Sequence, residues 1–289
     1  MSKGGHSRDS FDHTPILGVL MRENEMLVTS MHGGVDLTYA ALALEAAKEG
    51  ARAIDEHAAE FLQSVTSKGA RYDLVTRADK EAERAIISHL SDRSPSDGIL
   101  AEETGSREGT SGLRWVIDPI DGTTNFVHGR RDFAVSVGLE ARDGIFAGAV
   151  VRPAHGDWAA AEGDRIYSSV ERPMSVSSVK VNEALVAVGL CHDATARAFT
   201  LQQIVPVLVS HVQDWRWVGS AACDLFSVAD GSLDGYVGIN LNIWDIAAGI
   251  ALVKAAGGHC ETVRAGQIDA FLAGSPEVVT GLKYALADL

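Results

Sequence analysis

Cysteine is scarce in this chain, and the few cysteines are not arranged in pairs. The 289 residues include only Cys191, Cys223 and Cys260, which are widely spaced and form no CxxC motif. An odd number of separated thiols is typical of reduced, intracellular proteins. We therefore predict a cytoplasmic protein.

Long hydrophobic runs are lacking as well. The longest early apolar run, residues 15–21, is too short to span a membrane, and it has no basic segment or small-residue cleavage site beside it. We predict neither a membrane segment nor a secretory signal.

Positive charge is in short supply. Lys and Arg total 25 against 39 Asp and Glu, which gives a net charge of −14 and a pI of about 5.1. This balance argues against a nucleic-acid polymer as a partner, because such polymers are bound through basic surfaces. An acidic surface by itself indicates no more than solubility. If the acids gather in a cleft, however, metal ions must supply the positive charge that an anionic substrate needs.

The most informative stretch runs from residue 115 to residue 125 and reads WVIDPIDGTTN. Three apolar, strand-forming residues lead into Asp118, and a proline and a second aspartate follow. We interpret it as a buried strand that stops at Asp118, turns through the proline and leads into a helix starting near Gly122 or Thr123. Two carboxylates at a strand end, beside the N–H groups of a helix N-terminus, can hold a hard cation and a phosphate together. We predict that the active centre lies here.

The residues before this stretch divide into a tail and a helical region. Residues 1–34 are polar and lack periodicity, so we interpret them as an N-terminal extension. Apolar residues recur at spacings of three and four over residues 35–61, which predicts an amphipathic helix. A second helix is predicted over residues 76–90, with Asp79 at its third position. An apolar strand over residues 98–101 ends in two glutamates.

The residues after the central stretch change from strands alone to alternating strands and helices. Strands are predicted at 133–139, 145–151, 157–161, 185–189, 215–218 and 234–239, helices at 197–209, 221–229 and 245–256, and a last strand and helix within 270–289. We therefore divide the chain into an α+β part at residues 35–183 and an α/β part at residues 184–289.

Five separated segments carry a family resemblance when they are taken together. They are DLVT followed by Asp79, AEET at 101–104, DPIDGTTN at 118–125, GSAA at 219–222, and WD followed by AG within 244–249. In this order they resemble the inositol monophosphatase family, over residues 36–287. The resemblance implies a Mg²⁺-dependent, lithium-sensitive phosphatase. It also implies a homodimer and an α+β fold, the layered αβαβα sandwich of the inositol monophosphatase and sugar phosphatase type.

The resemblance assigns a metal site residue by residue. It implies that Glu102, Asp118 and the backbone carbonyl of Ile120 bind one Mg²⁺ ion. Asp118, Asp121 and Asp245 would bind a second ion, with Asp118 bridging the two. Two or three Mg²⁺ ions in each active site are implied.

The resemblance also assigns catalytic and substrate-binding residues. Asp79 and Thr123 would together orient the attacking water, and the implied catalytic residues are Glu102, Asp79, Thr123 and Lys68. The backbone N–H groups of Gly122 and Thr123 would bind the phosphate. The implied substrate-binding residues are Gly122, Thr123, Gly219, Ser220, Ala221 and Gly238.

Several of these residues have a structural alternative. Asp79, Thr123 and Asp245 each stand where a side chain can cap a helix. Lys68 can equally be a solvated lysine in a loop. For Asp245 the functional interpretation depends on the other acids, because Glu102 and the two central aspartates complete a ligand set with it.

One position departs from the family pattern. Gly238 lies seven residues before Asp245, where family members that act on inositol phosphates carry a glutamate that contacts ring hydroxyls. Glycine has no side chain to accept those hydrogen bonds, so we expect a changed substrate preference.

The function that follows is hydrolysis of a small polyol or sugar phosphate by attack of a metal-activated water. A 3′(2′),5′-bisphosphate nucleotidase or a sugar bisphosphatase is an alternative with the same chemistry. A non-catalytic regulatory protein that retains the fold is an alternative of another class. The intact set of Glu102, Asp118, Asp121, Thr123 and Asp245 counts against the regulatory alternative.

Overall fold

The computed structural model describes residues 38–289, except residues 62–65, 68–73, 76, 192 and 288. The predicted N-terminal extension at residues 1–34 lies outside the described residues, and so does Lys68.

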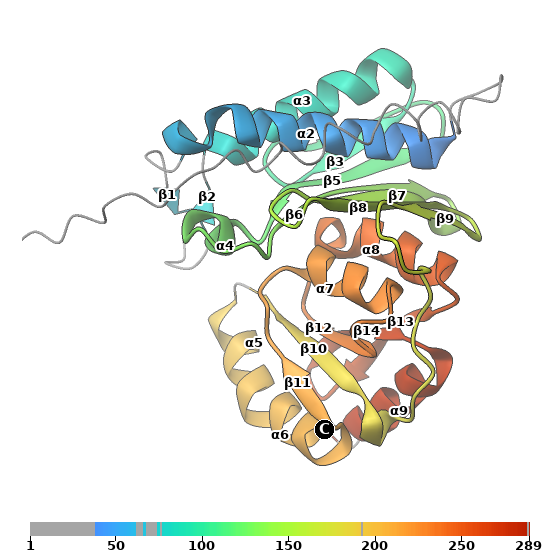
Figure 1. Ribbon diagram of the computed structural model, residues 1–289. Helices are drawn as coiled ribbons and strands as arrows, with labels where there is room; N and C mark the ends of the chain where they lie inside the picture. The colour runs from blue at the N-terminus through green and yellow to red at the C-terminus, as the bar shows by residue number, and fades with distance from the viewer. Residues whose placement is uncertain (1–37, 62–65, 68–73, 76, 192, 288) are drawn as a thin grey trace, which may run out of the picture.

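The elements form five layers, alternately helical and sheet (Figure 1). Helices α2 (Tyr39–Phe61) and α3 (Arg77–Arg93) cover one face of a seven-stranded sheet. Helices α7 (Ala221–Ala229) and α8 (Ile243–Ala255) lie between that sheet and a five-stranded sheet. Helices α5 (Ala194–Phe199), α6 (Val205–His211) and α9 (Pro276–Leu286) cover the far face of the second sheet. The predicted αβαβα sandwich is confirmed.

The larger sheet has the strand order β4-β3-β5-β6-β7-β8-β9. Its strands are β3 (Gly98–Ala101), β4 (Gly105–Arg107), β5 (Arg114–Asp121), β6 (Ala134–Ala141), β7 (Gly144–Arg152), β8 (Asp157–Glu162) and β9 (Arg165–Ser168). Strand β3 runs parallel to β5, so the carboxyl ends of these two strands meet at one edge. Helices cover both faces: Ile117 belongs to the core beneath α2 and α3, and its neighbour Val116 belongs to the core beneath α7 and α8.

The smaller sheet has the order β11-β10-β12-β14-β13. Its strands are β10 (Leu185–Leu190), β11 (Asp214–Arg216), β12 (Gly235–Ile239), β13 (His259–Ala265) and β14 (Ile268–Gly274). Strand β10 is parallel to both β11 and β12. A short pair, β1 (Thr66–Ser67) and β2 (Leu74–Val75), lies apart from both sheets. The division of the chain near residue 184 stays a prediction.

The predicted helix at 197–209 is present, and it is longer and less regular than predicted. Helical residues run from Ala194 to His211 without a break, as α5, a π-helical turn (Thr200–Ile204) and α6. Pro206 stands in the first turn of α6. Proline has no N–H and its ring excludes the carbonyl four residues earlier, so one α-helical hydrogen bond is lost here and the wider π-helical turn precedes the proline.

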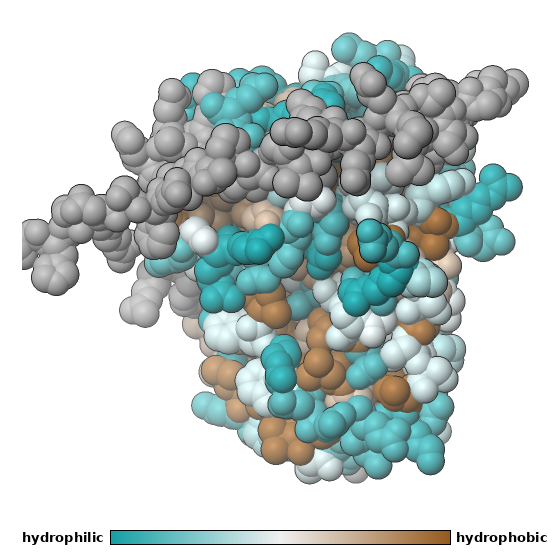
Figure 2. All heavy atoms as spheres, viewed as in Figure 1, coloured by the Kyte–Doolittle hydropathy of each residue, from teal (hydrophilic) through white to brown (hydrophobic). Residues whose placement is uncertain are grey.

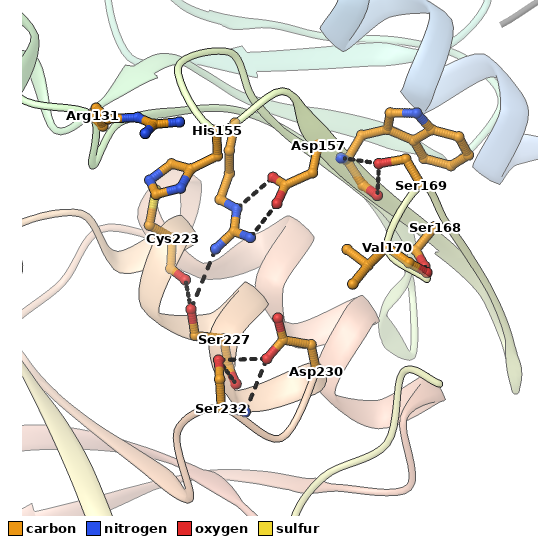
Figure 3. Close-up of polar contacts among 12 residues, drawn as sticks. Arg131, His155, Asp157, Ser168, Ser169, Val170, Cys223, Ser227, Asp230 and Ser232 are labelled. Carbon is orange, nitrogen blue, oxygen red and sulfur yellow. Dashed lines mark hydrogen bonds and ion pairs between the residues drawn. The ribbon is translucent and has the colours of Figure 1, made fainter. Parts of the chain in front are cut away.

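Arg152 at the end of β7 fastens the larger sheet to α7. Its Nε and Nη2 atoms donate to the two carboxylate oxygens of Asp157 at 2.7 and 2.6 Å, and Nη1 lies 3.4 Å from the hydroxyl of Ser227. Figure 3 shows Asp157 and Ser227 on different sides of this guanidinium. The guanidinium carbon also lies 3.8 Å from the centroid of the Phe226 ring. The contacts of Arg152 with Ser227 and Phe226 therefore join the end of β7 to α7, and Asp157 holds the guanidinium in place for them.

Replacing Arg152 by glutamine is expected to lower the free energy of unfolding by about 2–4 kcal/mol, because Asp157 then loses its bidentate partner. Denaturant unfolding followed by circular dichroism measures the change. Arg264→Gln is a matched control, because Arg264 pairs with Asp269 at the same spacing in the β13–β14 hairpin but both side chains are exposed. That variant should change stability by less than about 0.5 kcal/mol. Equal losses in the two variants would contradict the role given to Arg152.

The surface of the described residues carries both hydrophobic and hydrophilic side chains. Over the lower part of the view in Figure 2, hydrophobic and hydrophilic residues are interspersed. Within the described residues, no helix has both the length and the apolar character that crossing a membrane requires.

Candidate metal and phosphate site

Strand β5 continues past Asp118, where the sequence predicted its end. It pairs with β6 through Asp118 and Ser136 and again through Asp121 and Ala134, with a shift of register between the two pairs. Proline at position 119 has no N–H to give to the ladder, which is where strands accept a bulge. Residues three apart in a regular strand face opposite sides, and the extra residue of the bulge brings both aspartates toward one site. The predicted turn is therefore a bulge within a continuous strand.

Three aspartates meet at this edge of the larger sheet. One carboxylate oxygen from each of Asp118, Asp121 and Asp245 lies within 4.8 Å of the other two. Burial raises the pKa of Asp118 well above its usual range, and the negative charges of Glu102, Asp121, Asp245 and Asp79 raise it further. Like charges that close together are unfavourable without a cation between them. The cluster therefore has the composition of a site for a hard cation.

Asp121 is held by the start of α7. The Ser220 hydroxyl donates to Asp121 Oδ2 at 2.5 Å, and the N–H of Ala222 donates to the same oxygen at 2.6 Å. Ser220 also caps α7, because its hydroxyl oxygen accepts from the N–H of Cys223. Burial raises the pKa of Asp121 to about 6, although these hydrogen bonds oppose the rise. Ser220 thus has a role in holding the acid, and the substrate contacts of Gly219, Ser220 and Ala221 stay predictions.

Gly122 is followed by α4 (Thr123–Val127), so the helix begins where the sequence predicted. Gly122 has a φ of 91°, in the left-handed region, and a Cβ there would lie 2.9 Å from the carbonyl oxygen of Asp132. Both facts require glycine. The Thr123 Oγ1 lies 3.2 Å from Asp79 Oδ1 and 3.0 Å from the carbonyl oxygen of Ile120. The hydrogen bond expected between Asp79 and Thr123 is present, and the hydroxyl proton is shared between two acceptors.

Asp245 caps a helix and also faces the other two aspartates. It stands at the third position of α8, where Asp245 Oδ2 accepts from the N–H of Asn242 at 2.8 Å and completes a capping box. The structural alternative and the functional one are therefore compatible. The cap fixes one oxygen and so orients the carboxylate toward the site.

A cavity of about 510 Å³ opens above the aspartates. Its size suits a small molecule. The acidic side chains that line it are Glu102, Asp118, Asp121, Asp193 and Asp245. Among the described residues around this cavity, none is a lysine, arginine or histidine. An anionic substrate in this cavity therefore needs a cation that the described lining does not supply.

Gly238 is buried in β12 and is absent from the described lining of the cavity. A Cβ on Gly238 would lie 2.3 Å from Cδ1 of Leu241 and 2.8 Å from Cε1 of Tyr236. These two side chains occupy the space that a longer residue would need. A substrate contact at Gly238, and the changed substrate preference expected from it, stay predictions.

Two supporting residues were missed in the sequence. Glu83, buried in α3, accepts hydrogen bonds from the N–H groups of Glu103 at 2.8 Å and Thr104 at 3.0 Å, and so fixes the loop that carries Glu102. Its spacing of four from Asp79 on one helix was the available signal. Asn125 donates to the carbonyl oxygens of Asp132 at 2.7 Å and Val218 at 2.9 Å, which anchors the segment before Gly219. No local sequence pattern predicts the hydrogen bond between Asn125 and Val218.

Comparisons with known proteins agree on one family. Residues 36–287 match the model described as the inositol monophosphatase family. An inositol-1-monophosphatase from Mesorhizobium japonicum is 34% identical over 226 residues, which are 78% of this chain and 85% of that protein. The Nus factor SuhB of Escherichia coli is 35% identical over 222 residues, 75% of this chain and 83% of that protein. The extragenic suppressor protein suhB from Bartonella henselae superposes with a TM-score of 0.76 at 33% identity, covering 85% of this chain and 96% of that one.

Proposed function

Because this chain belongs to the inositol monophosphatase family, we propose that it hydrolyses phosphate monoesters of small polyols or sugars with the help of Mg²⁺. One observation carries the proposal: the described cavity lining has five acids and no basic side chain. A phosphate dianion would be repelled by such a lining unless divalent cations stood between them.

The donor set fits Mg²⁺. Oxygen atoms of Asp118, Asp121 and Asp245 lie within ligand reach of one another, and Glu102 lines the same cavity. Mg²⁺ prefers oxygen ligands and few of them from the protein, with water completing its shell. We assign these four acids and the carbonyl of Ile120 to two or three ions. Bound Mg²⁺ would neutralise the charge on the phosphate and make a nearby water more acidic.

The protein's own residues position the reactants. The Thr123 hydroxyl gives its proton to Asp79 or to the carbonyl of Ile120, so its oxygen lone pairs are left to accept from a water. Ser220 and Ala222 keep Asp121 turned toward the cavity. Phosphoryl transfer needs positioning and charge neutralisation more than covalent catalysis, so this division of roles is sufficient. Lys68 stays a predicted contributor.

A panel of phosphate monoesters with Mg²⁺ tests the proposal. We expect phosphate release from at least one small polyol or sugar phosphate. Because Gly238 presents no acceptor, kcat/KM for inositol 1-phosphate should be at least about tenfold below that of the best ester, the order expected when one hydrogen-bonded contact is lost. A high and selective kcat/KM for inositol 1-phosphate would contradict the argument from Gly238.

The alternatives are separated by the same panel. Preferential release from a 3′(2′),5′-bisphosphate nucleotide or a sugar bisphosphate would move the substrate to that class. The similarity to a relative named as a Nus factor keeps a regulatory function as a second candidate. Absence of release from every ester, with Mg²⁺ present, would favour it. We also propose that the protein works as a homodimer in the cytoplasm, as the resemblance and the cysteine usage indicate.

A further inference from the structure

Tyr236 in β12 has a buried hydroxyl that no hydrogen bond in the described structure satisfies. The residue is fully buried, yet its Oη has no partner among the described residues. A buried hydroxyl without a partner costs on the order of 1–3 kcal/mol, so such a group calls for a partner outside the described chain. Tyr236 also borders the cavity above the three aspartates.

Two glycines make room for the ring. Gly189 of β10 pairs with Gly238 of β12, and Ala187 pairs with Tyr236, so all four residues lie on one face of the sheet. A Cβ on Gly189 would lie 1.9 Å from the tyrosine oxygen, and one on Gly238 would lie 2.8 Å from its Cε1. The ring therefore extends over the two glycines toward the carboxyl ends of the parallel strands. The cavity lies at these ends, because Leu190, Cys191 and Asn240 line it.

The hydroxyl keeps its proton. Burial raises the pKa of Tyr236 well above its usual range, and the negative charges of Asp224, Asp121 and Asp245 raise it further. A protonated phenol donates one hydrogen bond, and the alcohol part of a substrate offers oxygen acceptors.

Leu241 packs beside the ring of Tyr236 and also lines the cavity. Its Cδ1 and the tyrosine Cε1 both lie close to the position that a Cβ on Gly238 would occupy, and its side chain is partly exposed. A change of rotamer in such a side chain is fast and costs little. A turn of Leu241 would open space beside the tyrosine ring without any movement of the sheet.

We propose that Tyr236 is a specificity-determining residue whose hydroxyl donates a hydrogen bond to a hydroxyl group of the substrate's alcohol part, once Leu241 has turned aside. This contact lies beside Gly238, at the position where the family resemblance places a glutamate. The hydroxyl of Tyr236 would donate a hydrogen bond to the substrate, whereas the glutamate would accept one. A glutamate at 238 would collide with both Leu241 and Tyr236. This inference rests on the proposed phosphatase function.

A matched pair of esters tests the contact. Glycerol 2-phosphate and isopropyl phosphate differ only in two hydroxyl groups, so the ratio of their kcat/KM values reports hydroxyl recognition. Tyr236→Phe should lower the preference for glycerol 2-phosphate about fivefold to tenfold, the factor of about one hydrogen bond. Leu241→Ala should raise that preference several-fold, and the double variant should lose the gain. The melting temperature of Tyr236→Phe should be equal to or above that of the wild type, because an unsatisfied hydroxyl is removed.

Three results would overturn the inference. An unchanged ratio in Tyr236→Phe means that the hydroxyl does not contact the substrate. A lower melting temperature with equal losses for both esters means that the hydroxyl is structural. A gain in Leu241→Ala that survives in the double variant assigns the effect to cavity size. If the wild type hydrolyses neither ester, the rise in melting temperature that each ester gives with Mg²⁺ tests the contact by the same comparison. The proposed function itself fails only if no ester of the full panel releases phosphate.

Discussion

Replacing Asp118 by asparagine is expected to lower phosphate release by at least about a thousandfold, the order seen when a group that manages transition-state charge is removed. Burial raises the pKa of Asp118, and the charges of four neighbouring carboxylates raise it further. Under the proposed metal assignment Asp118 would be a ligand of two ions. Asparagine keeps the shape and one oxygen but removes the charge that holds both.

The fold should survive this substitution. In metal-free protein the negative charge of Asp118 is repelled by its neighbours, so its removal is expected to leave the melting temperature unchanged or raise it. Initial rates of phosphate release with Mg²⁺, and thermal unfolding with a chelator present, give the two measurements.

A buried acid in the bend before β3 provides the control. Asp97 is buried and accepts a hydrogen bond from Trp115 Nε1 at 3.0 Å, which the amide oxygen of Asp97→Asn can still accept. That variant should keep activity within about threefold of the wild type, because it leaves the cavity untouched. Wild-type turnover in Asp118→Asn would refute the metal assignment, and equal loss in both variants would point to general damage.

The second large effect is a loss of stability with rising pH in protein freed of metal. The pKa of Asp121 is about 6 in the folded state, against about 3.9 in an unfolded chain. Below pH 4 the carboxyl is protonated in both states. Between pH 4 and pH 6 only the unfolded state loses the proton, so folding becomes less favourable. A difference of about two pKa units, at 1.36 kcal/mol each, corresponds to about 3 kcal/mol lost by pH 6.

Comparison with Asp121→Asn isolates this carboxyl from the others. Free energies of unfolding, measured with a chelator at pH 4 and pH 7.5, should be similar at the lower pH and favour the variant by up to about 3 kcal/mol at the higher one. Mg²⁺ should reverse the order at pH 7.5, because binding at 1,000-fold excess over Kd stabilises the folded wild type by about 4.1 kcal/mol. A higher free energy of unfolding for the wild type than for the variant, at pH 7.5 without metal, would contradict the raised pKa of Asp121.

The sequence located the central aspartates and the glycine turn of the site because this motif is local. Asp118, Asp121, Gly122 and Thr123 lie within six residues, and each residue type has a reason that can be stated without a fold. Glycine at 122, for example, is required by a positive φ and a close carbonyl. Helix α7 was predicted with its observed bounds, since Ser220 is a strong cap before an apolar run.

Contacts between distant segments were not predictable in the same way. Asp121 is bonded to Ser220, 99 positions away, and nothing in either segment specifies the other. Strand β13 was missed because only part of it is apolar, and it lies at a sheet edge. The sequence shows that residue 238 is a glycine. It does not show that Leu241 and Tyr236 occupy the space beside this glycine, because that depends on the path of the chain between β12 and α8.

The hydrogen bonds from the start of α7 to Asp121 mean that the site is complete only when the larger sheet and the helices beneath it are packed together. Asp118 and Asp121 belong to the larger sheet, whereas Ser220 and Asp245 belong to the helices beneath it. If the C-terminal half separates from that sheet, the ligand set is divided and each half keeps acids with no common cation. Activity would then require the two halves to be packed together, and partly folded chains would be inactive. Bound Mg²⁺ would link the two halves, and they would therefore unfold in a single cooperative step.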